Sequence, residues 1–207
     1  MCFDERAATW DDDPDKVARS AEVAAAIRRQ VDLGDRPRTL EVGAGTGLLS
    51  RALRADLGDV VLSDSSNGMI EVAERVIAAE RLTGWSTAYA NVDRGELPAG
   101  PFDLVLSQLA LHHMAEPESV LRLIHAALNP GGHLAIADLD HDPDGAFHKA
   151  HGDFHGHDGF DRVRLTHWLT ELRFADIQIS TATTLTKDVD GEPREFPIFL
   201  ATARKPG

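Results

Sequence analysis

Hydrophobic positions along this chain switch repeatedly between the spacing of a helix and the short runs of a buried strand. Apolar runs predict five strands, at residues 39–42, 60–62, 85–90, 102–107 and 133–137. Between most of these runs, apolar residues recur three and four apart, which predicts helices over residues 48–53, 69–77 and 120–128. This alternation is typical of a doubly wound α/β sheet whose strands are mostly parallel.

Both ends of the chain extend this pattern. Val17, Ala21, Ala24, Ile27 and Val31 share one helical face, and the polar residues 1–16 before them show little helical pattern. Near the other end, apolar residues 165–172 predict a helix, and β-rich runs at 177–186 and 196–203 predict an antiparallel pair joined by a polar loop at Asp190-Gly191. These two runs bring the predicted sheet to seven strands.

Composition limits the classes of protein that this chain can belong to. It has 207 residues, 43% hydrophobic and 27% charged, as expected for one globular domain over 1–207. A net charge of −13 argues against a nucleic-acid partner, and Cys2 as the only cysteine excludes an intrachain disulfide. Without a signal-like start or an apolar run of about 18 residues, we expect a cytoplasmic protein with no membrane partner. Its oligomeric state cannot be derived from these features.

A glycine-rich turn follows the first predicted strand. Gly43, Gly45 and Gly47 form a G-x-G-x-G pattern, and Leu48 stands where the dinucleotide fingerprint G-x-G-x-x-G requires its third glycine. Asp64 ends the second strand, 21 residues after Gly43, where such folds place a carboxylate that binds ribose hydroxyls. A nucleotide-like ligand other than NAD is therefore expected at the carboxyl edge of the sheet.

Six segments in this order resemble the class I S-adenosylmethionine-dependent methyltransferases of the small-molecule type: Leu-Glu-Val-Gly-Ala-Gly-Thr-Gly (40–47), Leu-Ser-Asp-Ser-Ser (62–66), Gly-Glu-Leu-Pro (95–98), Pro-Phe-Asp-Leu-Val (101–105), Leu-His-His (111–113) and Asn-Pro-Gly-Gly-His-Leu (129–134). The resemblance implies a Rossmann-like seven-stranded sheet with an antiparallel C-terminal strand. It also implies S-adenosylmethionine as cofactor and in-line transfer of its methyl group to a small organic acceptor.

The resemblance further implies which residues bind the cofactor. Asp64 would hold the ribose hydroxyls, Asp93 would accept from the adenine amino group, and Glu41 would face the methionine amine. The other implied cofactor-binding residues are Gly43, Ala44, Gly45, Gly47, Ser65, Met69, Val92, Arg94, Ser107 and Gln108.

Histidines supply the candidate catalytic groups, because imidazole titrates near neutral pH. His113 follows strand four, and His155 and His157 lie in a histidine-, aspartate- and glycine-rich loop over 139–162. A base role and a role in packing or orientation are both open for these side chains. The loop matches no recognised zinc spacing, so we expect no metal and interpret the loop as a cover over the acceptor site. Residues 1–35 are expected to form a helical lid, with Trp10 as its anchor.

Alternative functions remain open on the same fold. A nucleotide-dependent oxidoreductase is one, and a non-catalytic cofactor- or metal-binding protein is another. The residues after strand four, Ser107-Gln108-Leu109-Ala110, lack the Asn/Asp-Pro-Pro-aromatic motif of exocyclic-amine methyltransferases. Cys2 cannot serve as the nucleophile of a cytosine-C5 enzyme or as the thiol set of an arsenite enzyme. A small acceptor methylated on oxygen, nitrogen or carbon is the remaining expectation.

Overall fold

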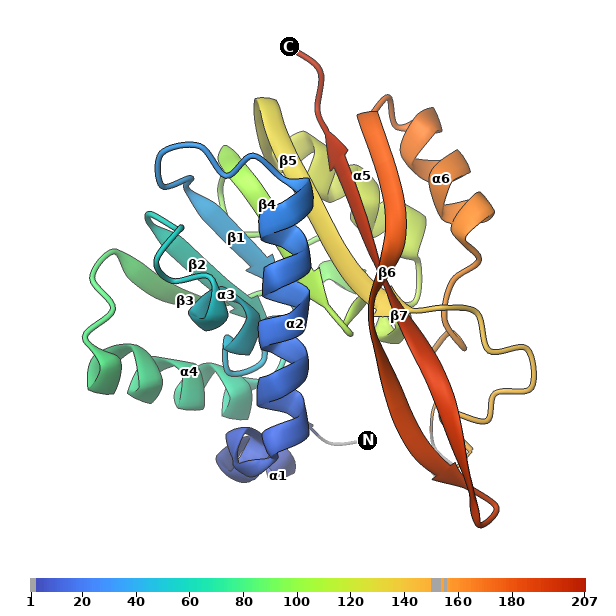
Figure 1. Cartoon of the computed structure of the whole chain (residues 1–207). Coiled ribbons are helices and arrows are strands. Elements are labelled where there is room, and N and C mark those ends of the chain that lie inside the picture. The colour runs from blue at the N-terminus through green and yellow to red at the C-terminus, as the bar shows by residue number, and fades with distance from the viewer. Residues whose placement is uncertain (1–2, 150–153, 155) are drawn as a thin grey trace.

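The computed structural model describes residues 3–149, 154 and 156–207. It contains one seven-stranded sheet in the order β3-β2-β1-β4-β5-β7-β6 (Figure 1), with β7 antiparallel to both neighbours. The strands are β1 (Thr39–Val42), β2 (Val60–Asp64), β3 (Trp85–Tyr89), β4 (Phe102–Gln108), β5 (Leu128–Leu139), β6 (Ala175–Val189) and β7 (Glu192–Arg204). The predicted α/β, Rossmann-like sheet with an antiparallel C-terminal strand is therefore confirmed.

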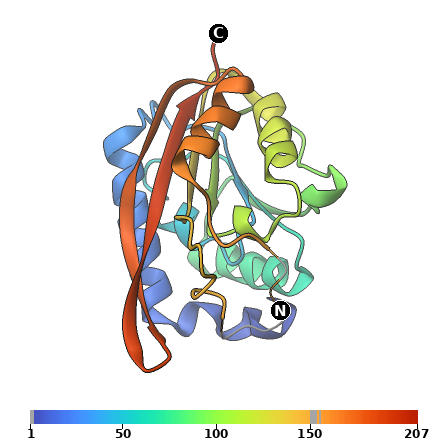
Figure 2. The same ribbon diagram turned by 90° about the vertical axis from the view of Figure 1, so that its right-hand side faces the viewer.

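Helices cover both faces of this sheet, and Figure 2 shows α2 on the side opposite α5 and α6. Strand β4 illustrates why both faces are covered: Leu104 and Leu106 pack with α2 and α3, whereas Val105 packs with α5 and α6. The helical elements are α1 (Phe3–Arg6), η1 (Ala7–Asp12), α2 (Pro14–Gln30), α3 (Leu48–Ala52), α4 (Asn67–Glu80), η2 (Val92–Arg94), η3 (Leu111–His113), α5 (Pro117–Ala127) and α6 (Arg162–Glu171).

Helix α2 differs from the sequence prediction in its start and in its buried face. The Asp13 side chain accepts a hydrogen bond from Asp15 N, and Pro14 occupies the first turn, so the helix begins before Val17. Val17 is 44% exposed and Ala21 is also exposed. These two residues share the predicted helical face but lie outside the hydrophobic core, because the first turns of α2 do not pack against it and this half of the helix instead lines a cavity.

Strands β6 and β7 are longer than the two predicted runs. They pair from Ala175↔Arg204 to Val189↔Glu192, so the connection is a tight turn at Asp190 and Gly191 rather than a longer polar loop. Both turn residues have positive φ, 55° and 92°, as the hairpin turn of matching twist requires. The hairpin extends past the rest of the sheet in Figure 1.

Described residues of the histidine-rich loop are tied to this hairpin. Arg194 of β7 forms ion pairs with Asp142 at 2.8 Å and with Asp144 at 2.7 Å. Lys149 pairs with Asp190 at 2.5 Å. These contacts hold the first half of the loop beside the carboxyl edge of β5.

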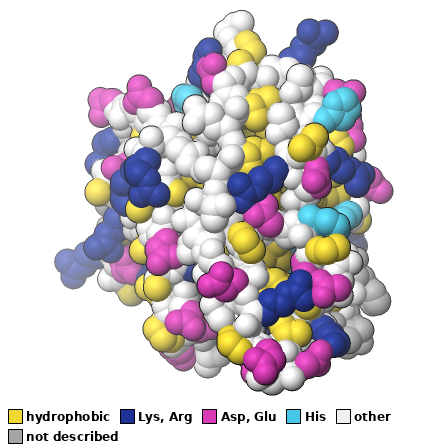
Figure 3. All heavy atoms as spheres, turned by 45° about the vertical axis from the view of Figure 1, so that its right-hand side comes forward, with side chains coloured by type: hydrophobic (Ala, Val, Ile, Leu, Met, Phe, Trp, Pro, Cys, Tyr) yellow, Lys and Arg dark blue, Asp and Glu magenta, His cyan; other side chains and the backbone are white. Residues whose placement is uncertain are grey.

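The surface carries mixed charge. On the face drawn in Figure 3, lysine and arginine side chains are interspersed with aspartate and glutamate. In the described part of the chain, no helix has both the length and the apolar run needed to cross a membrane.

Candidate active site

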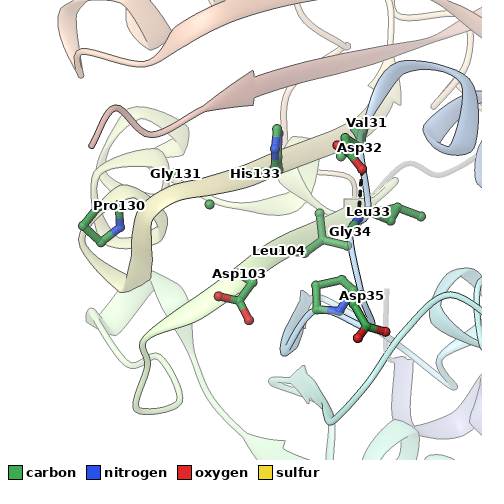
Figure 4. A pocket seen from close by; sticks show the side chains of 12 residues that line it. Val31, Asp32, Leu33, Gly34, Asp35, Asp103, Leu104, Pro130, Gly131 and His133 are labelled. Carbon is green, nitrogen blue, oxygen red and sulfur yellow. Dashed lines mark hydrogen bonds between the residues drawn. The ribbon is translucent and has the colours of Figure 1, made fainter.

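A cavity of about 910 Å³ opens at the carboxyl edge of the parallel strands. Its wall combines the segments that follow β1, β2, β3 and β4 with the N-terminal residues of α1, η1 and α2, residues 146–149 and the far end of β6. A smaller cavity of about 350 Å³ lies near the amino ends of β4 and β5, beside Asp32 and Asp35 (Figure 4). Ligands of such sheets bind at the carboxyl edge, so the larger cavity is the candidate site.

The glycine turn after β1 forms the floor of the large cavity. Gly43 and Gly45 have φ of 65° and 55°, which side chains rarely adopt. A Cβ on Gly43 would lie 2.4 Å from Ala110 Cβ, so the turn packs directly against the segment after β4. A Cβ on Gly45 would instead project toward Met69 Sδ at 3.8 Å and Trp10 Nε1 at 3.9 Å. Glycine at this position leaves the backbone open to a ligand.

Gly47 and Ala44 complete the turn in different ways. Ala44 lines the cavity, and its N–H donates to Ser63 O at 2.9 Å. Gly47 caps the N-terminus of α3 with φ 82°, and a Cβ there would lie 2.6 Å from Leu62 Cδ1. Gly47 does not line the cavity, so it shapes the turn from behind.

Asp64 ends β2 at the cavity wall. Its Oδ2 accepts from Gly45 N at 2.8 Å, and its Oδ1 accepts from Ser66 N at 2.9 Å. Burial raises the pKa of this carboxyl above its usual range, although backbone N–H groups partly compensate. Each oxygen keeps a second lone pair, so the fixed carboxylate can still accept two hydroxyl donors from a ligand.

Glu41 is a buried carboxyl on β1 that also lines the cavity. Its Oε2 accepts from Ser50 N at 3.1 Å and from Ser50 Oγ at 2.5 Å. Burial raises the pKa of Glu41 to about 7, because desolvation outweighs the bonds from Ser50. A cationic ligand group beside Glu41 would favour the ionised form.

The segments after β2 and β3 form one end of the cavity. Asp93 Oδ1 accepts from Ala115 N at 2.9 Å, which fixes the carboxylate beside the cavity. Arg94 belongs to the same short helix but does not line the cavity. The other predicted residues that line this end are Ser65, Met69 and Val92.

The two polar residues at the end of β4, Ser107 and Gln108, have different roles. Ser107 is buried and donates from Oγ to Val42 O at 3.0 Å, so it ties β4 to β1 and does not reach the cavity. Gln108 lines the cavity and donates from Nε2 to Ser20 Oγ of α2 at 3.0 Å. Its Oε1 is buried and has no hydrogen-bond partner in the described part of the chain. Gln108 therefore offers an acceptor to a ligand.

His112 and His113 lie together after β4, and both line the cavity. His112 Nδ1 is 2.6 Å from Asp138 Oδ1, and both side chains are buried. Burial, together with the neighbouring His112, lowers the pKa of His113 to about 3. His113 is therefore neutral at physiological pH, and its ring contacts Phe3 edge to face at 5.2 Å between centroids.

The loop histidines have separate positions. His148 lines the cavity and stacks on Phe154 at 3.5 Å between ring centroids, and burial lowers its pKa to about 4. His157 does not line the cavity. Its ring Nε2 donates to Met114 O at 3.1 Å, and its backbone N–H donates to His112 O at 2.7 Å, so the residue is held in the turn behind the cavity. His155 lies outside the described residues. The described part of the chain contains no group of three or more potential metal ligands.

Comparisons with known proteins identify the fold around this cavity. Residues 40–134 match the sequence family described as a methyltransferase domain. The chain carries a class I S-adenosylmethionine-dependent methyltransferase domain. Over 137 residues it is 37% identical to the biotin biosynthesis bifunctional protein BioCD of Bordetella avium, covering 64% of this chain and 28% of that protein.

A second curated relative and a solved structure are also similar to this chain. The ubiquinone biosynthesis O-methyltransferase of Ruegeria pomeroyi is 36% identical over 123 residues, covering 54% of this chain and 47% of that protein. The methyltransferase domain thus spans less than half the length of either curated relative. The structure of Haemonchus contortus phosphoethanolamine N-methyltransferase 2 with S-adenosyl-L-methionine has a TM-score of 0.73 at 18% identity, covering 89% of this chain and 52% of that one.

Several cavity residues of the methyltransferase domain were not among the predicted site residues. Arg19 and Lys16 lie on the half of α2 outside the core, Lys187 lies on β6, and His148 lies in the loop. Hydrophobic periodicity marks which residues enter a core, so it contains no signal for polar residues on a surface that another segment later closes. The pairing of α2, the loop and β6 across the cavity is a tertiary feature.

Proposed function

We propose that this protein transfers a methyl group from S-adenosylmethionine to a small organic acceptor. The observation that carries this proposal is the single cavity that begins at Asp64 and Asp93, passes Glu41 and Gln108, and continues to Lys187. Its volume, about 910 Å³, is near the upper end of the range of roughly 300–1,000 Å³ for small-molecule sites. A cavity of this extent has room for a cofactor and an acceptor together.

The end of the cavity at Asp64 and Asp93 suits the cofactor. Asp64 retains two acceptor sites for the ribose hydroxyls, and Gly45 leaves space where a side chain would meet the ligand. Glu41 is a buried carboxyl whose raised pKa a ligand ammonium group would lower. Asp93 keeps one oxygen for the adenine amino group. Each of these residues can thus bind the part of the cofactor to which the resemblance assigns it.

The end of the cavity between Gln108 and Lys187 suits an acceptor. When bound, the cofactor supplies a methyl group on a positively charged sulfur, which an acceptor lone pair can displace in line. The protein contributes by holding the acceptor atom in position, which is the proximity effect. Gln108 Oε1 and the neutral rings of His113 and His148 can accept a hydrogen bond from an acceptor N–H or O–H.

Of the three histidines proposed as catalytic, His113 is best supported, because its ring lines the cavity. His157 acts at most through the turn that it holds, since its ring bonds to Met114 O. His155 carries no geometric support because it lies outside the described residues. The proposed role of His113 is to orient the acceptor as a neutral group.

The relatives support a small acceptor. Their names refer to ubiquinone biosynthesis, to demethylmenaquinone and to phosphoethanolamine. An oxidoreductase is disfavoured because Leu48 occupies the position of the third fingerprint glycine.

The deciding experiment measures binding and turnover separately. Calorimetry with S-adenosylmethionine tests binding, and formation of its demethylated product is then followed with a panel of phenols, amines and carboxylic acids. We expect binding by the wild-type protein and turnover with at least one acceptor, both reduced in Asp64→Ala. Absence of cofactor binding would refute the proposal, and binding without turnover across a broad panel would favour a non-catalytic cofactor-binding protein.

A further inference from the structure

Basic side chains gather at the acceptor end of the cavity in a chain whose net charge is −13. Arg19 comes from α2, Lys187 comes from β6, and Arg6 lies at the rim, over the ring of Trp10. Lys187 is far from Arg6 and Arg19 in sequence, and the packing of β6 against α2 brings it to the same wall. A ligand at this end of the cavity would therefore meet several positive charges.

Arg19 is the most informative of these cations. Its Nε is buried and has no hydrogen-bond partner in the described part of the chain. Burial lowers the pKa of its guanidinium, and the carboxylates of Asp13 and Asp15 only partly offset that effect. No carboxylate among the described residues lies within ion-pair distance of Arg19. A buried guanidinium donor without an acceptor is costly unless a ligand supplies one.

Lys187 is a second, half-buried cation at this end of the cavity. Its Nζ donates to Phe147 O at 3.1 Å and lies 3.6 Å from the centroid of the Phe147 ring. Burial lowers the pKa of Lys187, and repulsion from Arg19 and Arg6 lowers it further. The ammonium group has three donors, so two remain for a ligand.

Several other charged side chains near Arg19 and Lys187 are paired or exposed. Lys16 pairs with Asp13 at 3.5 Å, and Lys149 pairs with Asp190 at 2.5 Å. Asp188 is exposed and accepts from Gly191 N in the hairpin turn. These pairings leave Arg19 and Lys187 as two adjacent cations without a carboxylate in ion-pair contact, within the described residues.

We propose that Arg19 and Lys187 together bind an oxyanion of the acceptor, a carboxylate or a phosphate, so that the methyl acceptor is an anionic small molecule. The guanidinium presents planar donors that match either oxyanion, and a lysine ammonium adds a second positive charge. This inference rests on the proposed methyltransferase function, because it names the acceptor class of the same site.

The anion site is connected to the place of methyl transfer. Gln108 ends β4, and its side chain donates to Ser20, the residue after Arg19 in α2. His113 and His148 line the same cavity. An acceptor anchored through its anion at Arg19 can therefore extend past these neutral side chains toward the glycine turn.

The test compares acceptors that differ only in charge. Each parent phenol or amine keeps its methyl-accepting group free and carries one of three substituents: a carboxylate, a phosphomonoester or a neutral carboxamide. Inorganic phosphate and acetate serve as competing ions. We expect at least one anionic form to have a kcat/KM about tenfold to a hundredfold above that of its neutral partner, the range expected for hydrogen bonds to a charged group. A carboxylate site should prefer the carboxylate form and be inhibited by acetate, whereas a phosphate site should prefer the phosphomonoester and be inhibited by inorganic phosphate.

Variants make the result specific to the two cations. Arg19→Gln and Lys187→Gln should remove the preference by raising KM for the anionic form, whereas Lys187→Arg should retain most of it. Arg122→Gln, an exposed arginine on α5, serves as the control. Calorimetry with S-adenosylmethionine should give the wild-type affinity in every variant. Neutral acceptors preferred by the wild type, or a charge preference that survives both Gln variants, would overturn the anion site. Loss of cofactor binding in the wild type would instead refute the proposed function.

Discussion

Asp64 is the residue on which cofactor binding should depend most. Backbone N–H groups of Gly45 and Ser66 hold its carboxylate at the cavity wall. We expect Asp64→Ala to lose about 1–3 kcal/mol of binding free energy, because two ligand hydroxyls would lose their acceptor. This corresponds to a roughly 5- to 150-fold rise in the calorimetric Kd for S-adenosylmethionine. Glu71→Ala, at an exposed position of α4, is the control. Equal affinities in the two variants would contradict the assignment.

Glu41 should make both stability and cofactor affinity depend on pH. Because burial raises its pKa to about 7, the folded protein holds a proton that the unfolded chain releases near its usual pKa. The stabilisation from this group is complete below about pH 4.5 and is lost as the pH rises through 7. Relative to Glu41→Gln, the wild type should lose up to about 3 kcal/mol of unfolding free energy between pH 4.5 and 8.

Urea denaturation of both proteins without cofactor measures this difference. Binding of a ligand ammonium should shift the Glu41 pKa downward, so the affinity of the wild type for cofactor should rise between pH 6 and 8. A parallel pH dependence in wild type and Glu41→Gln would show that Glu41 does not titrate in this range.

His113 and His148 should stay neutral over the physiological range. Burial is the main cause that lowers their pKa values, to about 3 and about 4. Their imidazole signals, assigned by NMR with His113→Asn and His148→Asn, should show no titration between pH 5.5 and 8. His167, exposed on α6, supplies the signal of an imidazole outside the cavity for comparison. Titration of His113 near neutral pH would restore it as a candidate general base.

At the scale of elements, the N-terminal segment α1–η1 is attached across the cofactor end of the cavity. Asp4 accepts from Gly68 N at 2.8 Å at the start of α4, and Asp11 accepts from Thr46 Oγ1 at 2.5 Å in the glycine turn. Arg51 of α3 pairs with Asp11 at 2.6 Å. These bonds support the proposal that the segment acts as a lid with Trp10 as its anchor.

We expect Trp10 to report cofactor binding by fluorescence, because its indole lies near Gly45. In Trp10→Phe the fluorescence change on binding should disappear, whereas Trp168→Phe, on α6, should retain it. Trp10→Ala should also raise the Kd for the cofactor several-fold, because part of the cavity wall is lost. Unchanged affinity and fluorescence response in the Trp10 variants would contradict a lid over the cofactor.

The whole molecule should become more stable when the cofactor binds. A ligand at 100 times its Kd adds about 2.7 kcal/mol to the unfolding free energy. For a chain of this length, that corresponds to a rise in Tm of roughly 5–10 °C. We therefore expect S-adenosylmethionine and its demethylated product to raise Tm, and NAD at the same concentration to leave it unchanged. A shift with NAD alone would favour the oxidoreductase.

Local sequence patterns determined the framework of this protein. Alternation of apolar runs and helical faces is a property of neighbouring residues, so it predicted the seven strands and their order along the chain. The same holds for the glycine turn and for Asp64, because the end of a parallel strand is known once the strand is known. These features contain most of the proposed cofactor site.

The tertiary structure decided which polar side chains meet. Alternation along β4 predicts that Ser107 and Gln108 point to opposite faces of the sheet, but only the packed structure shows that one side chain bonds to Val42 O and the other faces the cavity. Arg19 and Lys187 are separated by most of the chain, and they share a cavity wall only because β6 packs against α2. Contacts between distant segments depend on how the whole sheet and its covering helices pack, and no local periodicity encodes them.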